Sequence, residues 1–347
     1  MNRFTIMDVT MRDGSYAVNF QFSLSQQRLI TTGIEDLGFE YIEIGHGMGL
    51  GASSPENGIA LHTDEEYLDT ARKSLKKAKY GTFCIPGIAK LEDVEKAASY
   101  GAGFLRFGTN VTDVKNSEPY IKKARDLGII PMANLMKSYA LKPEELADKV
   151  AEAESFGAEC VYIVDSAGCM LPDDIKRCYE AIRKVTDVKL GFHGHDNLGL
   201  VLWNSFTAIE QGFEFIDCTL QGIGRSSGNA PLEMMCINAK KMGYDLDVDL
   251  IKLLNLGKKY VYPLCHRYNS IDTMCGVSGM HTGFLGSVRK VSGEYGVNPL
   301  SLIDMYSDYS RIKMDADKLE EMAKTLPQDE ESLVITDFNG YFGHGQY

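Results

Sequence analysis

The chain has 347 residues and carries 48 Asp and Glu against 36 Lys and Arg, so its formal net charge is −12 at pH 7. An acidic balance of this size argues against a nucleic-acid partner, and no apolar run is long enough to cross a bilayer. The N-terminus lacks the charged segment followed by an apolar segment that is typical of a signal peptide. The eight cysteines form no C-x-x-C pair. The composition therefore predicts a cytoplasmic enzyme with reduced thiols.

Strand-like and helix-like runs alternate along the first two thirds of the chain. Residues 142–157 are typical of the helical runs, because Leu146, Val150 and Ala153 share one face. The eight strands are expected at residues 5–13, 41–46, 80–85, 104–110, 129–136, 160–168, 189–196 and 215–222. A strand–helix pair repeated eight times predicts a closed (β/α)8 TIM barrel. A doubly wound open sheet is the alternative, but no G-x-G-x-x-G follows the first strand.

The alternation stops after the eighth strand and its helix. Residues 250–268 and 282–325 have helical patterns, and a glycine-rich stretch at 275–283 lies between them. We therefore expect two domains. The first, over residues 1–245, is the barrel, and the second, over residues 246–347, is a helical domain that covers the barrel mouth and ends in a tail.

The seventh predicted strand ends in His193 and His195. Side chains two apart on a strand project from the same face, and two imidazoles on one face can bind a single divalent ion. Asp13 ends the first strand, and in a closed barrel the first and seventh strands are both neighbours of the eighth. We therefore predict that Asp13, His193 and His195 form one metal site at the C-terminal end of the barrel, where barrel enzymes do their chemistry.

Other predicted strand ends are also polar. The residues expected at the barrel mouth are Arg12, Glu43, His46, Asn134, Asp165, Ser166 and the loop 222–229 with Asn229. Asp165 and Ser166 could contact a substrate, or they could orient His193 through a hydrogen bond. His46 could contact a substrate, but a histidine at such a position is more often a plain strand-end residue. Asn229 could ligate the metal or only brace its turn.

Four motifs carry a resemblance to a known family: VTMRDG at residues 9–14, DSAG at 165–168, GFHGH at 191–195 and GIGRSSGNAPLE at 222–233. In this order they resemble the metal-dependent TIM-barrel lyases and condensing enzymes that include hydroxymethylglutaryl-CoA lyase and isopropylmalate synthase. Within that superfamily the chain resembles the 4-hydroxy-2-oxovalerate aldolases. The resemblance covers nearly the whole chain, including the C-terminal helices.

The resemblance implies a divalent ion, Mn²⁺ before Mg²⁺, Co²⁺ or Zn²⁺, held by the predicted triad with a 2-oxo acid bound to it. It also implies that Arg12 lies beside the oxo group and stabilises the enolate oxygen when the carbon–carbon bond breaks. The alternative for Arg12 is an ion pair with Asp13 or Glu43 that only closes the barrel. The residues expected to contact the substrate are Ser166, Asn134, His46 and Asn229.

One departure from the family concerns the general base. In these aldolases the third residue after the catalytic aspartate is a histidine that acts as the base, whereas this chain has Tyr16. The chain has His281 where the family has a tyrosine in its C-terminal glycine-rich stretch, and Met48 where the family has an aspartate. Tyrosine titrates at about 10 and histidine at about 6.5. Either His281 has taken over the proton transfer and Tyr16 orients the substrate hydroxyl, or the chain acts on a substrate other than 4-hydroxy-2-oxovalerate.

We expect a carbon–carbon lyase that cleaves or forms a bond in a 4-hydroxy-2-oxo acid, giving pyruvate or a pyruvate-like 2-oxo acid and an aldehyde. Two other interpretations stay open. One is a Claisen-type enzyme that joins an acyl-CoA to a metal-bound 2-oxo acid, and the other is a non-catalytic barrel subunit. We also expect a homo-oligomer, and the resemblance implies an acylating aldehyde dehydrogenase as a partner of the C-terminal domain.

Overall fold

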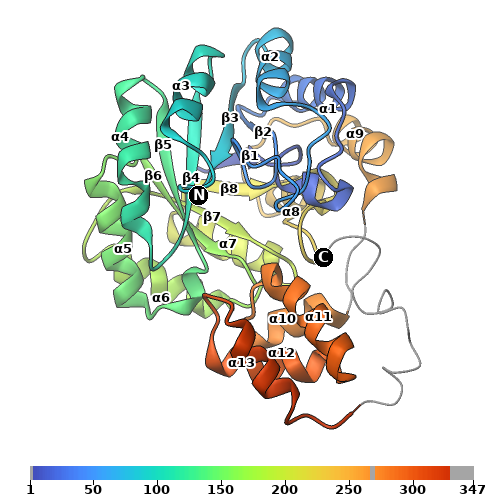
Figure 1. Cartoon of the computed structure of the whole chain (residues 1–347). Helices are drawn as coiled ribbons and strands as arrows, with labels where there is room; N and C mark the ends of the chain where they lie inside the picture. Colours follow the sequence, from blue (N-terminus) through green and yellow to red (C-terminus); the bar gives the residue numbers. More distant parts are fainter. Residues whose placement is uncertain (1–2, 266–269, 329–347) are drawn as a thin grey trace.

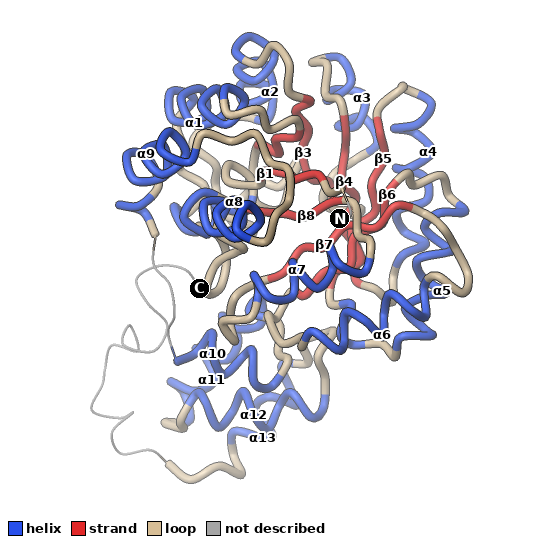
Figure 2. The backbone as a smooth tube through the Cα atoms, turned by 180° about the vertical axis from the view of Figure 1, so that it is seen from behind, coloured by secondary structure: helices blue, strands red, loops and turns tan. Residues whose placement is uncertain are grey.

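The computed structural model describes residues 3–265 and 270–328. Its centre is a closed barrel of eight parallel strands, in which each strand pairs with the next and β8 pairs with β1. Figure 2 shows the strands as an inner ring with helices around it. The strands are β1 (Thr5–Asp8), β2 (Tyr41–Ile44), β3 (Lys79–Cys84), β4 (Phe104–Asn110), β5 (Ile130–Met136), β6 (Cys160–Asp165), β7 (Lys189–Gly194) and β8 (Phe215–Cys218). The prediction of a (β/α)8 barrel is confirmed.

A helix follows each strand and packs on the outside of the ring (Figure 1). These helices are α1 (Leu24–Asp36), α2 (Asp64–Ser74), α3 (Leu91–Ser99), α4 (Glu118–Asp126), α5 (Pro143–Ser155), α6 (Pro172–Ile182), α7 (Val201–Gln211) and α8 (Leu232–Lys241). Local sequence sets their first turns. Ser23, for example, accepts a hydrogen bond from the backbone N–H of Gln26, whose side chain bonds back to the Ser23 N–H. This capping box satisfies donors that the first turn of α1 would leave unpaired.

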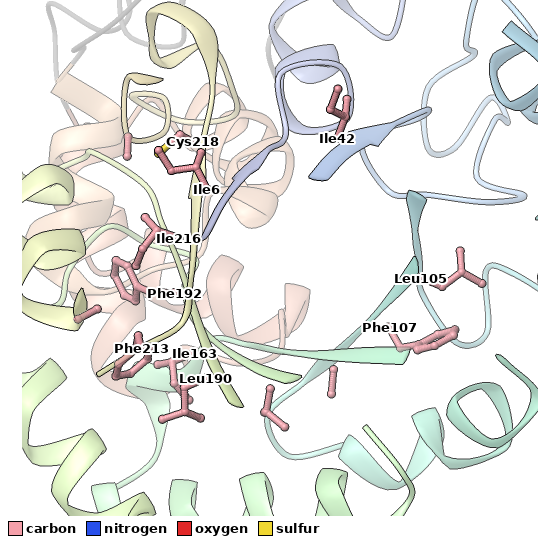
Figure 3. Packing of buried hydrophobic residues seen from close by; sticks show 14 of the residues in the cluster. Ile6, Ile42, Leu105, Phe107, Ile163, Leu190, Phe192, Phe213, Ile216 and Cys218 are labelled. Carbon is pink, nitrogen blue, oxygen red and sulfur yellow. The ribbon is translucent and has the colours of Figure 1, made fainter. Parts of the chain in front are cut away.

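Alternate residues of each strand face opposite sides of the barrel wall. Outward-facing side chains such as Ile6, Leu105 and Ile216 pack between the strands and the helices (Figure 3). Inward-facing Phe104 and Phe215 fill the barrel with a second apolar cluster. Burying each such side chain stabilises the fold by about 1.5–3 kcal/mol. The same inward faces end in polar residues at the barrel mouth, and there the site is built.

Several strands are shorter at their C-terminal ends than the sequence predicted. The run predicted to reach Asp13 leaves the sheet at Asp8, whose carboxylate accepts hydrogen bonds from the backbone and hydroxyl of Thr10. Asp13 instead begins a 3-10 helix that ends at Val18. Polar side chains at the mouth bond to nearby backbone in place of the strand ladder, and this competition ends the strands early. The predicted ends of the sixth, seventh and eighth strands are too long for the same reason.

The C-terminal helices are α9 (Leu250–Tyr260), α10 (Ser270–Ser278), α11 (Leu285–Tyr295), α12 (Pro299–Tyr309) and α13 (Ala316–Ala323). The helical pattern predicted over 282–325 is divided into α11, α12 and α13. Gly296 ends α11 in the left-handed conformation, and Asn298 caps α12 through its side chain. The extended Ser310 then separates α12 from α13.

The first part of the glycine-rich stretch at 275–283 is helical, because α10 continues to Ser278. Gly276 is helical where α10 passes close to the loop after β7, since a Cβ there would lie 2.9 Å from the Cβ of Asn197. A glycine in a helix costs about 1 kcal/mol relative to alanine, but here it permits this close approach. Figure 1 shows α10–α13 gathered on one side of the barrel.

Helix α9 packs against the barrel, because a Cβ at Gly33 of α1 would lie 2.6 Å from the side chain of Leu256. Leu253 of α9 belongs to the barrel's apolar cluster, whereas α10–α13 share a cluster of their own. The division of the chain after residue 245 stays a prediction. The end of the predicted helix at 266–268 and the tail beyond residue 328 lie outside the described residues. Within the described part of the chain, no helix has the length and apolar character to cross a membrane.

Candidate metal centre and active site

The structure brings Asp13, His193 and His195 together at the C-terminal end of the barrel. Asp13 follows β1, while His193 lies on β7 and His195 directly follows that strand. One ligand atom from each residue lies within 4.8 Å of the others, and all three side chains are buried. The Nε2 atom of His193 is 3.8 Å from Oδ2 of Asp13. This arrangement is a facial set of one carboxylate and two imidazoles.

The electrostatics favour the protonation states that a metal ion requires. Burial opposes ionisation of Asp13, but Arg12 and the two imidazoles outweigh it and hold the pKa of the carboxyl below its usual range. Burial lowers the pKa of His195 to about 3, so the ring is neutral at pH 7. A metal ligand must be an anionic carboxylate or a neutral imidazole. Asp13 and His195 are therefore ready to bind a cation.

Two buried polar atoms in the site support the fit. Nδ1 of His195 and Oδ1 of Asn229 make no hydrogen bond within the described residues. An unpaired buried polar atom costs free energy, so it marks a place where a ligand would compensate. The mixed nitrogen and oxygen donors of the triad suit a divalent ion of hard or borderline character. The residues present fit such an ion.

A buried series of ion pairs contacts His193 and Asp13 of the triad and positions both side chains. Nδ1 of His193 lies 2.8 Å from Oδ2 of Asp217 on β8, so the ring donates there and leaves Nε2 for a metal. Arg106 on β4 donates to Asp217 at 2.7 Å and to Glu43 on β2 at 2.6 and 2.8 Å. The contacts of Arg106 and Asp217 were not predicted from the sequence. The available signal was a charged residue, Arg106 or Asp217, at an inward position of an apolar strand.

Arg12 connects this series of ion pairs to Asp13. Its Nε donates to Oε2 of Glu43 at 2.6 Å, and its Nη1 donates to Oδ2 of Asp13 at 2.6 Å. The predicted alternative of an ion pair with Asp13 or Glu43 is therefore part of the structure. Nη2 of Arg12 makes no hydrogen bond to any residue described, so its N–H groups remain for another ligand. We call Arg12, Glu43, Arg106 and Asp217 the floor network.

A cavity of about 170 Å³ opens above the triad. Eight of the ten predicted site residues line it: Arg12, Asp13, Tyr16, Asn134, Ser166, His193, His195 and His281. Strand ends from β5, β6 and β7 therefore meet the loop after β1 and the C-terminal helices at one place. His46 and Asn229 are absent from the lining.

His46 braces a loop away from the cavity, whereas Asn229 lies beside the metal site. In His46, Nε2 bonds to the carbonyl of Gly58 at 3.0 Å and Nδ1 accepts from the backbone N–H of Met48 at 3.1 Å. With both ring nitrogens used, the loop-bracing role is the better explanation for His46. Asn229 donates from Nδ2 to Oδ1 of Asp13 at 2.9 Å, so it holds a metal-site residue in place.

Asn134 and Ser166 present polar atoms to the cavity, since Oδ1 of Asn134 has no hydrogen-bond partner in the described chain. The Ser166 hydroxyl accepts from the backbone N–H of Lys137 at 3.0 Å. Asp165 accepts from the backbone of Cys169 and Met170, so it braces the loop after β6. The suggestion that Asp165 orients His193 is wrong, because Asp217 makes that contact.

Tyr16 and His281 reach the cavity from opposite ends of the sequence. Burial raises the pKa of Tyr16. Burial, together with Arg225 and Lys137, lowers the pKa of His281 well below its usual range, so its ring is neutral at pH 7. Nδ1 of His281 accepts from the backbone N–H of Gly283 at 3.0 Å. The ring proton is therefore on Nε2, and His281 presents an N–H donor in this conformation.

Two further cations, Lys137 and Arg225, line the cavity. Lys137 was not predicted, whereas Arg225 belongs to the loop 222–229 that was expected at the barrel mouth without a role. Lys137 directly follows β5 with a φ of 62°, and its Nζ donates to the carbonyl of Ile312 at 2.6 Å. Burial, and then Arg225, lower the pKa of Lys137 to about 8. The Arg225 guanidinium lies 5.2 Å from the centre of the Tyr16 ring. The left-handed backbone of Lys137 is strained for a side chain other than glycine, and such strain is concentrated at functional sites.

Comparison with known proteins agrees with the fold and shows the family. The family model named HMGL-like matches residues 3–259. The 4-hydroxy-2-oxovalerate aldolase of Carboxydothermus hydrogenoformans is 36% identical over 314 residues, which are 90% of this chain and 93% of that protein. The 4-hydroxy-2-oxovalerate aldolase 4 of Paraburkholderia xenovorans is 33% identical over 339 residues, with 96% and 98% covered.

A solved structure extends the similarity of fold to the C-terminal helices. The carboxyl transferase domain of Rhizobium etli pyruvate carboxylase superposes with a TM-score of 0.75 at 15% identity, covering 93% of this chain and 60% of that one. At this identity the match supports the fold alone.

Proposed function

The chain belongs to the HMGL-like family and to its 4-hydroxy-2-oxovalerate aldolases, and from this membership we propose how its site works as a divalent-metal-dependent carbon–carbon lyase. It interconverts a 4-hydroxy-2-oxo acid with pyruvate, or a pyruvate-like 2-oxo acid, and an aldehyde. The relatives favour this aldolase reaction over an acyl-CoA condensation and over a non-catalytic barrel. The observation that carries the mechanism is the meeting of the triad with Arg12 and His281 in one cavity.

Asp13, His193 and His195 would hold the ion, and we propose Mn²⁺ as the native metal because the resemblance to the 4-hydroxy-2-oxovalerate aldolases implies it. One carboxylate and two imidazoles are compatible with such a divalent ion. When bound, a divalent ion supplies Lewis-acid stabilisation of negative charge on the oxygens of a 2-oxo acid. The floor network carries one more carboxylate than guanidinium when Asp13 is included. That excess negative charge also favours a cation at the triad.

Arg12 stabilises the charge that develops during cleavage. When the bond between C3 and C4 breaks, the electron pair passes into the 2-oxo acid as an enolate. Arg12 has two contacts fixed by Asp13 and Glu43 and free N–H groups on Nη2. A guanidinium held in this way needs little rearrangement when the oxygen becomes negative, which is the source of its catalytic effect.

Cleavage also requires that the C4 hydroxyl lose its proton. We propose that His281 accepts it and that Tyr16 orients the hydroxyl. For this step Nε2 must present a lone pair, so the ring proton must move to Nδ1 and the bond from the Gly283 N–H must open. The lowered pKa of His281 keeps the ring neutral at pH 7, so a ring nitrogen with a lone pair is available for this step.

Deuterium exchange at C3 of pyruvate tests this function directly. Protein loaded with Mn²⁺ should exchange these protons in D₂O and should form an adduct when an aldehyde is added, both read by NMR. Asp13→Asn should lose metal and both activities, while Asp187→Asn, a change of the same kind on an exposed residue, should retain them. A metal-loaded wild-type protein without exchange or adduct would contradict the aldolase assignment.

We also propose a homo-oligomer and an acylating aldehyde dehydrogenase that receives the aldehyde product. The α10–α13 unit, which lies beside the cavity and contributes His281 to it, supports a docking role for this part of the chain. Size-exclusion chromatography with light scattering would measure the oligomer. Co-purification with the dehydrogenase encoded nearest to this protein would test the partner.

A further inference from the structure

The catalytic cavity continues into a second, larger hollow. The inner cavity measures about 170 Å³, which is below the roughly 300 to 1,000 Å³ of most ligand pockets. The outer hollow measures about 600 Å³. The residues that line both are Tyr16, Met48, Lys137, Arg225 and His281. A substrate longer than the 2-oxo acid itself therefore extends outward between these side chains.

Lys137 and Arg225 face this junction without a carboxylate partner. Neither forms an ion pair with an acid in residues 3–265 or 270–328. Lys137 donates to a backbone carbonyl and lies 5.1 Å from the centre of the Phe284 ring. Arg225 contacts the Tyr16 ring. By contrast, both guanidiniums of the floor network are paired with carboxylates.

The two cations are close enough to affect one another and His281. A Cβ on Gly283 would lie 2.8 Å from Nη2 of Arg225 and 2.7 Å from Nδ1 of His281, so these two side chains flank one glycine. Glu56, the acid that lines the outer hollow within the described chain, is exposed at its rim and pairs with neither cation. Two like charges at a partly desolvated junction are unfavourable unless an anion joins them.

The 2-oxo acid end of the substrate does not explain these cations. The triad and Arg12 line the inner cavity only, so the 2-oxo acid group belongs there. Asn134 and Ser166 are also confined to the inner cavity. Lys137 and Arg225 line both hollows, so they stand at the junction toward which the carbons beyond C4 extend.

We infer that the aldehyde portion of the substrate carries an anionic group, a carboxylate or a phosphate, that binds between Lys137 and Arg225. This inference rests on the proposed function. The reaction balances without another reactant: the C3–C4 bond breaks, the C4 hydroxyl loses its proton and becomes an aldehyde, and C3 gains a proton to give pyruvate. The anionic group leaves unchanged on the aldehyde.

Matched aldehydes test the inference in the condensation direction with pyruvate and Mn²⁺-loaded enzyme. Succinate semialdehyde is compared with butanal for a carboxylate, and glyceraldehyde 3-phosphate with glyceraldehyde for a phosphate. In at least one pair the anionic member should have the higher kcat/KM, by about 10-fold or more, as expected for charge-assisted hydrogen bonds. The pair with the larger ratio identifies the anion.

Lys137→Met and Arg225→Met should each reduce this ratio by about 10- to 100-fold. The ratio within one enzyme cancels any general loss of turnover. Lys184→Met removes a charge from an exposed position outside both hollows and serves as the control. If Lys137→Met does not fold, because it loses the bond to Ile312, Arg225→Met carries the test alone.

Pyruvate exchange separates the two ways to fail. If the enzyme exchanges the C3 protons but prefers neutral aldehydes, or if both variants keep the wild-type ratio, the anionic subsite is wrong and the aldolase function stands. If exchange itself is missing from metal-loaded enzyme, the proposed function is wrong and the substrate class fails with it.

Discussion

The two charged regions of this site differ in how their charged side chains are paired. In the floor network every guanidinium is buried and bonded to a carboxylate, and the chain of contacts runs from Asp13 to His193. At the junction above it, Lys137 and Arg225 pair with no carboxylate within the described residues; their partners there include the Ile312 carbonyl and the side chains of Phe284 and Tyr16. Paired buried charges fix geometry, whereas unpaired ones are available to a ligand. We therefore expect floor mutations to affect chemistry with every substrate and junction mutations to affect the choice of substrate.

The largest effect is expected at His281, which lines both the inner cavity and the outer hollow. His281→Phe should lower turnover by about 10²- to 10⁴-fold, the usual share of a general base, and Tyr16→Phe should cost less. Because the pKa of His281 is lowered, the wild-type rate should fall only when the pH drops below about 6.5. This acidic limb in kcat should be absent from His281→Phe. A variant that retains the limb and most of its turnover would place the base elsewhere.

Arg12→Lys tests the floor network. Lysine keeps the positive charge, but it cannot bond to Asp13 and Glu43 at the same time and still present further N–H groups to the substrate. Turnover should therefore fall by about 10²- to 10³-fold. Metal content, measured by elemental analysis, should change far less than turnover. The loss should be equal for anionic and neutral aldehydes. Wild-type turnover in this variant would assign Arg12 a purely structural role.

Asp217→Asn should have a smaller effect, because Asp217 acts through His193 rather than on the substrate. Loss of such a supporting contact typically lowers metal affinity by about 10- to 100-fold. Raising the Mn²⁺ concentration should restore most of the turnover. The control is Asp173→Asn, where the carboxylate pairs with Lys176 on an exposed helix. Tight metal binding by Asp217→Asn would show that the floor network does not control the triad.

The smallest effect is expected from pH at the junction. The pKa of Lys137 is about 8, lowered by burial and by Arg225 and Lys313 and opposed by Asp113. Lys137 therefore loses its charge as the pH rises through about 8. The kcat/KM for the preferred anionic aldehyde should decline several-fold between pH 7 and 9.5 relative to its neutral match, with Arg225 maintaining the remainder. Lys137→Arg should remove this decline, and a pH-independent ratio in the wild type would exclude Lys137 from the subsite.

Much of the fold followed from local pattern. The alternation of strand-like and helix-like runs predicted the barrel, since both periodicities can be recognised within a few residues. The closed order of eight strands then placed Asp13 beside His193 and His195, because the C-terminal ends of neighbouring strands meet at one mouth. The strand ends were predicted too long, since the side-chain bonds that end them, such as Asp8 to Thr10, resemble ordinary strand residues in sequence.

The sequence by itself determined the architecture, the triad and the presence of Tyr16 and His281 as an unusual pair. Only the tertiary structure decided that Asp217 supports His193, that Gly283 fixes the proton on His281, and that Lys137 meets Arg225 beside the cavity. Periodicity reports which way a side chain points from its own element, and it carries no information on which distant charge lies opposite. Closure of the barrel and the packing of α10–α13 against it decide which residues a charged side chain contacts. Those contacts decide whether the side chain stabilises the site or is available to the substrate.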